Sequence, residues 1–170
     1  MELILFRHGI AEDASPQQDD ADRRLTPRGV ERTRLACVGL ARVCDRPQAV
    51  ISSSKTRARQ TAEMLGQVFD REPEVWPALA GEQVEPVLER LREREAGVLL
   101  MVGHEPMLSE LVTRLCTPGA SATPGGAIEM KKAGAACLEA GLGRNEPRTA
   151  GRLRWLLPPR VLRTLGEAPS

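Results

Sequence analysis

The chain contains two histidines, and each lies two positions after a short apolar run. His8 follows the run that ends at Phe6, and His104 follows the run that ends at Val102. A neutral imidazole can attack phosphorus and form a covalent phosphohistidine that water then hydrolyses. Histidine also takes part readily in proton transfer near neutral pH. These two residues are therefore the first candidates for chemistry.

Two arginines are placed to act with the histidines. Arg7 directly precedes His8, and Arg57 lies in the first turn of the helix expected after the second strand. Guanidinium groups bind phosphate oxygens bidentately and neutralise charge on a transferring phosphoryl group. Two imidazoles and two guanidinium groups that converge would suit phosphoryl transfer without a metal. For either histidine alone, a hydrogen-bonded residue near the surface remains the alternative.

The elements that must position these side chains alternate in type along the chain. Three short apolar runs predict buried strands at 2–6, 49–51 and 98–102. The last run is apolar on both faces, as a central strand covered by helices requires. Capping residues and apolar spacing predict four helices, from Thr26 to about residue 44, from Ser52-Ser53-Ser54 to Phe69, over 84–91 and over 108–115.

The C-terminal part of the chain predicts further strands. Residues 128–131 and 135–139 are expected to pair as a hairpin that turns at Gly134. A last short strand is expected over 152–156, and Pro158-Pro159 should end it. Three loops are expected, an acidic one over 11–24, a Pro/Gly-rich one over 117–126 and another over 140–151.

This order predicts a single compact α/β domain over residues 1–170, with a three-layer α/β/α arrangement and a mostly parallel central sheet. In such sheets, ligands bind beyond the carboxyl ends of the strands. His8 and His104 fall at that edge, and Arg57 follows the second strand closely. One domain also suits the length of 170 residues.

The composition excludes several other classes of protein. A net charge of +1 gives little bulk attraction to nucleic acids or membrane surfaces. The longest apolar run, 98–102, is far below the roughly 20 residues that span a bilayer, and residues 3–6 are too few for a secretory signal. We expect a cytoplasmic monomer with no metal or cofactor. The cysteines lack CxxC pairing and are expected as free thiols in a reducing compartment: Cys37, Cys44, Cys116 and Cys137.

Four ordered segments resemble the histidine phosphatase superfamily, the phosphoglycerate-mutase-like proteins. Arg7-His8-Gly9 is similar to the family's first-histidine signature, and residues 25–29 (LTPRG) are similar to its LTxxG helix start. Residues 52–62 (SSSKTRARQTA) resemble its SxxxRxxQTA segment, and residues 102–106 (VGHEP) resemble its VxHxP motif. The resemblance covers roughly residues 2–115 and implies the phosphoglycerate-mutase-like fold.

Within that superfamily the chain resembles the SixA-type phosphohistidine phosphatases. Only 15 residues separate Gly9 from Leu25, so the chain lacks the long lid-forming insertions of the larger branches. Residues 131–136 and 153–158 also look similar to the SixA-type tail. An uncovered groove would suit a phosphorylated side chain on another protein.

The resemblance implies a role for each matching residue. His8 would be the nucleophile that is transiently phosphorylated. Arg7, Arg57 and His104 would hold the phosphoryl oxygens, with His104 protonated in the complex. Arg59 should face elsewhere on its helix, and Arg23 is either a rim contact for substrate or a solvated residue.

Many family members also have a carboxylic acid that protonates the leaving oxygen. The nearest candidate is Glu82, which could equally be a helix N-terminal glutamate that favours the dipole. Glu12, Asp13 and Glu105 are weaker candidates. An imidazole leaving group, whose ordinary pKa is about 6.5, needs such an acid less than an alkoxide does.

The sequence therefore predicts a phosphohistidine phosphatase that acts on a protein, the phosphotransfer domain of a bacterial-type phosphorelay. One alternative is a phosphatase of the same fold that acts on a small-molecule or phosphoserine ester. Another is a phosphate-binding module without turnover. The acidic loop 11–24 would gate or orient a protein partner, or would simply be solvated.

Overall fold

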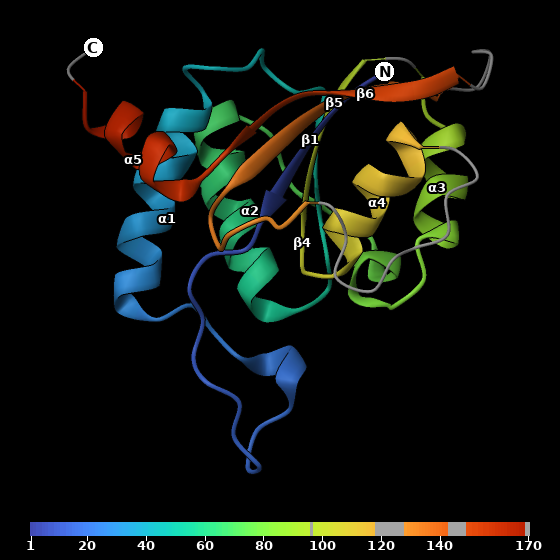
Figure 1. Cartoon of the computed structure of the whole chain (residues 1–170). Helices are drawn as coiled ribbons and strands as arrows, with labels where there is room; N and C mark the ends of the chain where they lie inside the picture. Colours follow the sequence, from blue (N-terminus) through green and yellow to red (C-terminus); the bar gives the residue numbers. More distant parts are fainter. Residues whose placement is uncertain (96, 118–127, 143–148, 169–170) are drawn as a thin grey trace.

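The computed structural model describes residues 1–95, 97–117, 128–142 and 149–168. These residues form a six-stranded sheet with helices on both faces (Figure 1). The strands, in the order in which they lie side by side, are β3 (Glu74–Val75), β2 (Ala49–Ser52), β4 (Val98–Gly103), β1 (Glu2–Arg7), β5 (Ala135–Gly141) and β6 (Thr149–Leu157). The α-helices are α1 (Pro27–Leu40), α2 (Thr56–Phe69), α3 (Glu85–Arg92), α4 (Met107–Cys116) and α5 (Pro159–Glu167).

The register of the parallel strands aligns their carboxyl ends. Arg7 at the end of β1 pairs with Gly103 at the end of β4, and Ser52 at the end of β2 pairs with Val102. Because parallel strands end at the same edge of a sheet, the next residues of the three strands leave the sheet together. This alignment brings the two predicted histidines to one place.

Apolar side chains on both faces of the central strands build two separate cores. Leu3 and Leu5 of β1 point to one core, which α3 and α4 cover. Ile4 and Phe6 point to the other core, which α1, α2 and α5 cover. Strands buried on both faces are typical of a parallel sheet between two helical layers. The predicted three-layer α/β/α fold with a mostly parallel sheet is therefore confirmed, and β5 is antiparallel to β1.

The predicted strand over 128–131 and its hairpin with 135–139 are wrong. Residues 128–131 are irregular, and the backbone N–H of Met130 donates to the Glu105 carboxylate rather than to a neighbouring strand. The antiparallel partner of β5 is β6, which begins at Thr149 within the loop predicted over 140–151. Residues 143–148 of that loop, and 118–126 of the loop predicted over 117–126, lie outside the described residues.

The helices differ from the prediction at three points. α2 begins at Thr56 with Lys55 at its N-cap and no side-chain cap, so the predicted capping by Ser52-Ser53-Ser54 is wrong. α1 ends at Leu40 rather than near residue 44, because the N–H groups of Arg42 and Val43 bond only three residues back and close the helix with tight turns. Pro158-Pro159 ends β6 as predicted but also begins α5, with proline in the first turn. Proline is well suited there because its missing N–H would have no partner in the helix.

Free thiols are confirmed for the four cysteines. Cys37 and Cys137 are buried, whereas Cys44 and Cys116 are partly exposed. In the part of the chain that the structure describes, none of the helices combines the length and apolar content needed to cross a bilayer.

Candidate active site

His8 lies directly after β1 with its imidazole fixed in one orientation. Its Nδ1 lies 2.7 Å from the carbonyl oxygen of Gly9, which can only accept a hydrogen bond, so Nδ1 carries the proton. The Nε atom of Arg57 donates to Nε2 of His8 over 3.3 Å. This pattern defines the Nδ1–H tautomer and leaves the lone pair on Nε2. Nε2 is therefore the atom that can act as a nucleophile.

Burial keeps this imidazole uncharged. His8 is 5% exposed. Desolvation lowers its pKa to about 3, against the opposing effect of the hydrogen bond to Gly9, and the positive charges of Arg57, Arg7 and Lys132 lower the pKa further. An unprotonated imidazole is the form that can attack phosphorus.

His104 lies after β4, next to the first histidine. The two ring centroids are 4.9 Å apart. Nε2 of His104 is 2.7 Å from Oγ of Ser53, and its Nδ1 is buried without a hydrogen-bond partner among the described residues. Desolvation is the main cause that lowers the pKa of His104 to about 2, and electrostatic interactions with His8, Arg57 and Lys55 lower it further. His104 is therefore neutral in this structure, and its protonation in a phosphoryl complex stays a prediction.

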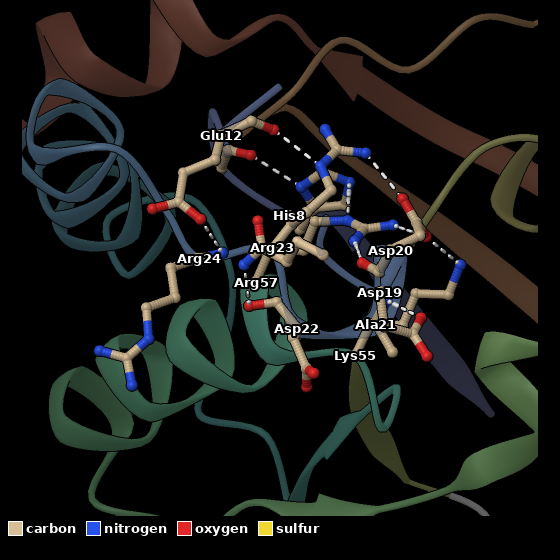
Figure 2. Close-up of polar contacts among 12 residues, drawn as sticks. His8, Glu12, Asp19, Asp20, Ala21, Asp22, Arg23, Arg24, Lys55 and Arg57 are labelled. Carbon is tan, nitrogen blue, oxygen red and sulfur yellow. Dashed lines mark hydrogen bonds and ion pairs between the residues drawn. The ribbon is translucent and has the colours of Figure 1, made fainter. Parts of the chain in front are cut away.

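Arg57 is held in the first turn of α2 with its guanidinium group almost fully buried. Nε faces His8, and the two terminal nitrogens face Asp20. Nη1 donates to the backbone oxygen of Asp20 over 2.5 Å, and Nη2 donates to its Oδ2 over 2.9 Å. Figure 2 shows these contacts around the His8 ring. The predicted convergence of Arg57 and His8 is thus present in the structure, and their roles in phosphoryl transfer stay a prediction.

Arg7 reaches the same edge of the sheet from the end of β1. Its Nη1 donates to the backbone oxygen of Met130 over 2.6 Å, while its Nε is buried without a partner among the described residues. A buried donor without an acceptor costs free energy unless a ligand or water supplies one. Arg7 therefore keeps one donor without an acceptor in the described structure.

Threonine and glutamine side chains of the 52–62 segment hold the surrounding backbone. Oγ1 of Thr61 accepts from the N–H of Gly9 over 3.2 Å and donates to the carbonyl oxygen of Arg57 over 2.8 Å. Oε1 of Gln60 accepts from the N–H of Leu25 over 2.8 Å. These bonds connect the His8 turn, α2 and the chain entering α1.

Two glycines of the motifs are required by close packing. A Cβ atom on Gly9 would lie 2.0 Å from Oγ1 of Thr33, and one on Gly29 would lie 2.0 Å from the backbone oxygen of Ile10. No side chain fits at these distances. The start of α1 can therefore pack directly against the turn that carries His8.

The acidic loop 11–24 is bound to the site rather than simply solvated. Its short 3-10 turn, Asp20–Asp22, places Asp20 over Arg57. The Asp20 carboxylate also accepts from Lys55 and from Arg23. Arg23 is thus paired with this carboxylate rather than solvated, and its role as a rim contact for substrate stays a prediction. Asp20, Lys55 and Ser53 are contacts that sequence reasoning missed, since only the fold brings them to the histidines.

The candidate general acids are carboxylates that are either exposed or already accept hydrogen bonds from other groups. Glu82 and Asp13 are exposed. Glu105 accepts from Ser109 and from the backbone N–H of Met130, and Glu12 accepts from the backbone N–H of Arg24. None of these four carboxylates forms a hydrogen bond or ion pair with His8 or His104 in the described part of the chain.

Arg59 is exposed on α2, as predicted.

The arrangement can perform phosphoryl transfer to nitrogen. It supplies an uncharged imidazole with its lone pair on Nε2, a second neutral imidazole beside it and two arginines. Among the described residues, no cluster of three or more His, Cys, Asp and Glu side chains could hold a metal ion. The guanidinium groups are the residues suited to bind phosphoryl oxygens.

Comparison with known proteins agrees with this geometry. Residues 3–81 match the family model of the histidine phosphatase superfamily (branch 1). The chain is 34% identical to an uncharacterized protein of a Picosynechococcus strain, over 93% of this chain and 100% of that protein. It is 30% identical to the phosphohistidine phosphatase SixA of Escherichia coli (strain K12), over 70% of this chain and 76% of that one.

A solved structure of the protein histidine phosphatase SixA complexed with tungstate superposes with a TM-score of 0.76 at 26% identity. The match covers 95% of this chain and 99% of that one. The fold, the sequence match and the paired histidines therefore lead to the same assignment: the chain belongs to the histidine phosphatase superfamily and is of the SixA type.

Proposed function

We propose that this phosphatase removes the phosphoryl group from a phosphohistidine on another protein, the phosphotransfer domain of a bacterial-type phosphorelay. The observation that carries the proposal is the state of His8. Its Nε2 lone pair faces Arg57, and no carboxylic acid stands free beside it among the described residues. A site with a strong nucleophile and no clear acid favours a leaving group that departs readily, and an imidazole is such a group.

The reaction would proceed in two displacements. Nε2 of His8 attacks phosphorus, the P–N bond of the substrate breaks, and the substrate imidazole leaves with the electron pair and takes a proton from water. Water then attacks the phosphorus on His8, the second P–N bond breaks, and inorganic phosphate is released while the lone pair returns to Nε2. Arg7 and Arg57 would stabilise the charge on the phosphoryl oxygens in both steps.

The shape of the molecule supports a macromolecular substrate. Residues 11–24 form a long arm that extends from the body at the edge where β1 ends (Figure 1). The exposed cation Lys132 also lies near enough to His8 to lower its pKa. The projecting arm and the exposed cation beside the nucleophile provide a surface that a protein partner could contact. We propose that the protein acts in the cytoplasm, because four free thiols suit a reducing compartment. We also propose that it acts as a monomer.

The test is a comparison of purified protein on two substrate classes. One is a phosphotransfer domain labelled with ³²P on histidine, and the other is a panel of small-molecule and phosphoserine esters. We expect loss of label well above that of His8→Ala, little ester hydrolysis, and near-native activity in the exposed control Arg59→Ala. Preferential ester cleavage would show instead that the protein is an ester phosphatase. Glu82, the candidate general acid, would then be the next residue to substitute. Label that accumulates on His8 without hydrolysis would indicate a binding module.

A further inference from the structure

Asp20 gathers three positive side chains of the site on one carboxylate. Oδ2 accepts from Nζ of Lys55 over 2.8 Å and from Nη2 of Arg57 over 2.9 Å. Oδ1 accepts from Nη1 of Arg23 over 2.7 Å. Figure 2 shows the four side chains converging beside His8. Lys55, Arg57 and Arg23 together hold the pKa of Asp20 well below its usual range, so the carboxylate is charged.

Asp20 holds both ends of the Arg57 guanidinium group. Its backbone oxygen binds Nη1 and its carboxylate binds Nη2. A planar guanidinium held at both terminal nitrogens cannot turn about its own bonds, so the direction of Nε–H is fixed as well. That direction is toward Nε2 of His8.

The loop is braced so that Asp20 itself stays in place. The carboxylate of Asp19 caps the short turn by accepting from the N–H of Ala21 over 2.9 Å. The backbone oxygen of Glu12 accepts from Nε of Arg23 over 2.7 Å, and its carboxylate accepts from the N–H of Arg24 over 3.0 Å. The bonds of Glu12 join the beginning of the loop to its end, close to Asp20.

We propose that Asp20 is a positioning residue for Arg57. It acts through the guanidinium group and keeps Nε–H facing Nε2 of His8, the place where phosphorus is attacked. The inference rests on the phosphoryl-transfer role proposed for His8. A phosphoryl site gains most from donors that are oriented before the reaction, because no reorganisation is then needed in the transition state. A carboxylate on the loop supplies this orientation for an arginine on α2.

The first measurement is the single-turnover rate at which ³²P passes from a phosphohistidine protein or a phosphoramidate donor to His8. In Asp20→Asn and Asp20→Ala we expect this rate to fall roughly 10- to 100-fold, the usual cost of a lost orienting contact. The matched control is Asp22→Asn, because Asp22 lies in the same turn, is exposed and makes no side-chain hydrogen bond in the described structure. The control should stay within about twofold of the wild type, in line with other surface substitutions.

A double-mutant cycle shows whether Asp20 works through Arg57. In the Arg57→Ala background, Asp20→Asn should change the transfer rate by less than about twofold, since the group it positions is absent. The Nε–H and Nη signals of Arg57 in ¹⁵N NMR spectra provide a second test that needs no substrate. In the wild type the Nη groups should rotate slowly and give separate signals. In Asp20→Asn these signals should average because the groups rotate faster, while the melting temperature of the protein stays unchanged.

The rival role for Asp20 is that of an anion that blocks the site. A transfer rate in Asp20→Asn equal to or above that of the wild type would overturn the proposal in favour of that role. An equal loss of rate in the wild-type and Arg57→Ala backgrounds would overturn it too, as would Arg57 NMR signals unchanged by the substitution. If no donor phosphorylates His8 in the wild type, the proposed function fails, while the NMR comparison still decides the role of Asp20.

Discussion

The Nε atom of Arg57 donates a hydrogen bond to Nε2 of His8 across 3.3 Å. A guanidinium that donates to the nucleophilic atom has two effects on phosphoryl transfer. Before the reaction it adds to the burial that keeps the imidazole uncharged. When Nε2 turns its lone pair to phosphorus, the same N–H becomes free to donate to a phosphoryl oxygen. The contact therefore prepares both the nucleophile and the charge that the transition state requires.

Two arginines of α2, two positions apart, provide a matched pair for testing this role. Arg57→Ala should lower kcat for phosphohistidine hydrolysis by about 100- to 1000-fold, the usual effect of removing one donor to a developing oxyanion. Arg59→Ala should leave kcat within about twofold, because Arg59 is exposed. Steady-state kinetics with melting temperatures checks the pair. Equal losses in the two variants would contradict the assigned role of Arg57.

The buried histidines predict the pH dependence of activity. Because the pKa of His8 is lowered to about 3, the nucleophile stays unprotonated far below neutral pH. The rate of His8 labelling should therefore show no acid-side inflection near the ordinary histidine value of about 6.5. Rapid-quench labelling between about pH 4.5 and pH 8 measures this. An inflection near pH 6.5 that requires His8 would show that the imidazole titrates normally.

The same pKa values predict how stability changes with pH. His8 and His104 are neutral in the folded state down to a pKa of about 3 and about 2, whereas in the unfolded chain each takes a proton near 6.5. Below pH 6.5 the unfolded chain therefore binds more protons, and the free energy of unfolding falls as the pH is lowered toward 3. Urea unfolding at several pH values checks the sign. A His104→Asn variant should show a shallower slope.

Glu105 supports Arg7 through one backbone segment. Its carboxylate accepts from the N–H of Met130, whose carbonyl oxygen holds Nη1 of Arg7. Glu105→Gln replaces one of the two acceptor oxygens by a donor, so the backbone N–H of Met130 or of Ser109 loses its acceptor at a cost of about 1–3 kcal/mol. We expect weaker binding of inorganic phosphate and lower stability, measured by calorimetry and urea unfolding. Glu110→Gln on the same side of the molecule is the control, and equal effects in the two variants would contradict the link to Arg7.

Thr61 is predicted to be important for stability rather than for chemistry. Thr61→Val removes the acceptor of the buried N–H of Gly9 and should lower the free energy of unfolding by about 1–3 kcal/mol. Thr113→Val is the control, because that hydroxyl only donates to Ser109 within α4. Urea unfolding of both variants makes the comparison. A loss no greater than that of the control would show that water replaces the threonine hydroxyl.

Local patterns were sufficient to predict three of the four parallel strands and the placement of His8, His104, Arg7 and Arg57 at their carboxyl ends, whereas the two-residue strand β3 was missed. The apolar runs of β1 and β4 are continuous because both faces are buried, and each run is followed at once by a histidine. Residues 128–131 were predicted wrongly because alternation of apolar and polar residues cannot distinguish a strand from an irregular segment held by Glu105. α5 was missed because Pro158-Pro159 reads first as the end of a strand.

The contacts of Asp20 could not be predicted because they depend on three segments at once. Asp20, Arg23 and Lys55 are charged residues in polar stretches, where a solvated side chain is the ordinary outcome. Only the register of β1 against β4, and of β4 against β2, brings the loop after β1 to the start of α2. Local patterns and the resemblance to a family both located the histidines, but the partner of Arg57 is visible only in the folded chain.

The groups that would bind an oxyanion come from widely separated parts of the chain: Arg7 at the end of β1 and His8 after it, Arg57 after β2, and His104 after β4. An unfolded chain cannot present them together, so an oxyanion binds only the folded state. By mass action, phosphate or tungstate at 100 times its dissociation constant should stabilise the fold by about 2.7 kcal/mol. The reaction product would thus protect the enzyme that releases it, and denaturation curves recorded with and without the anion would report site occupancy without any turnover.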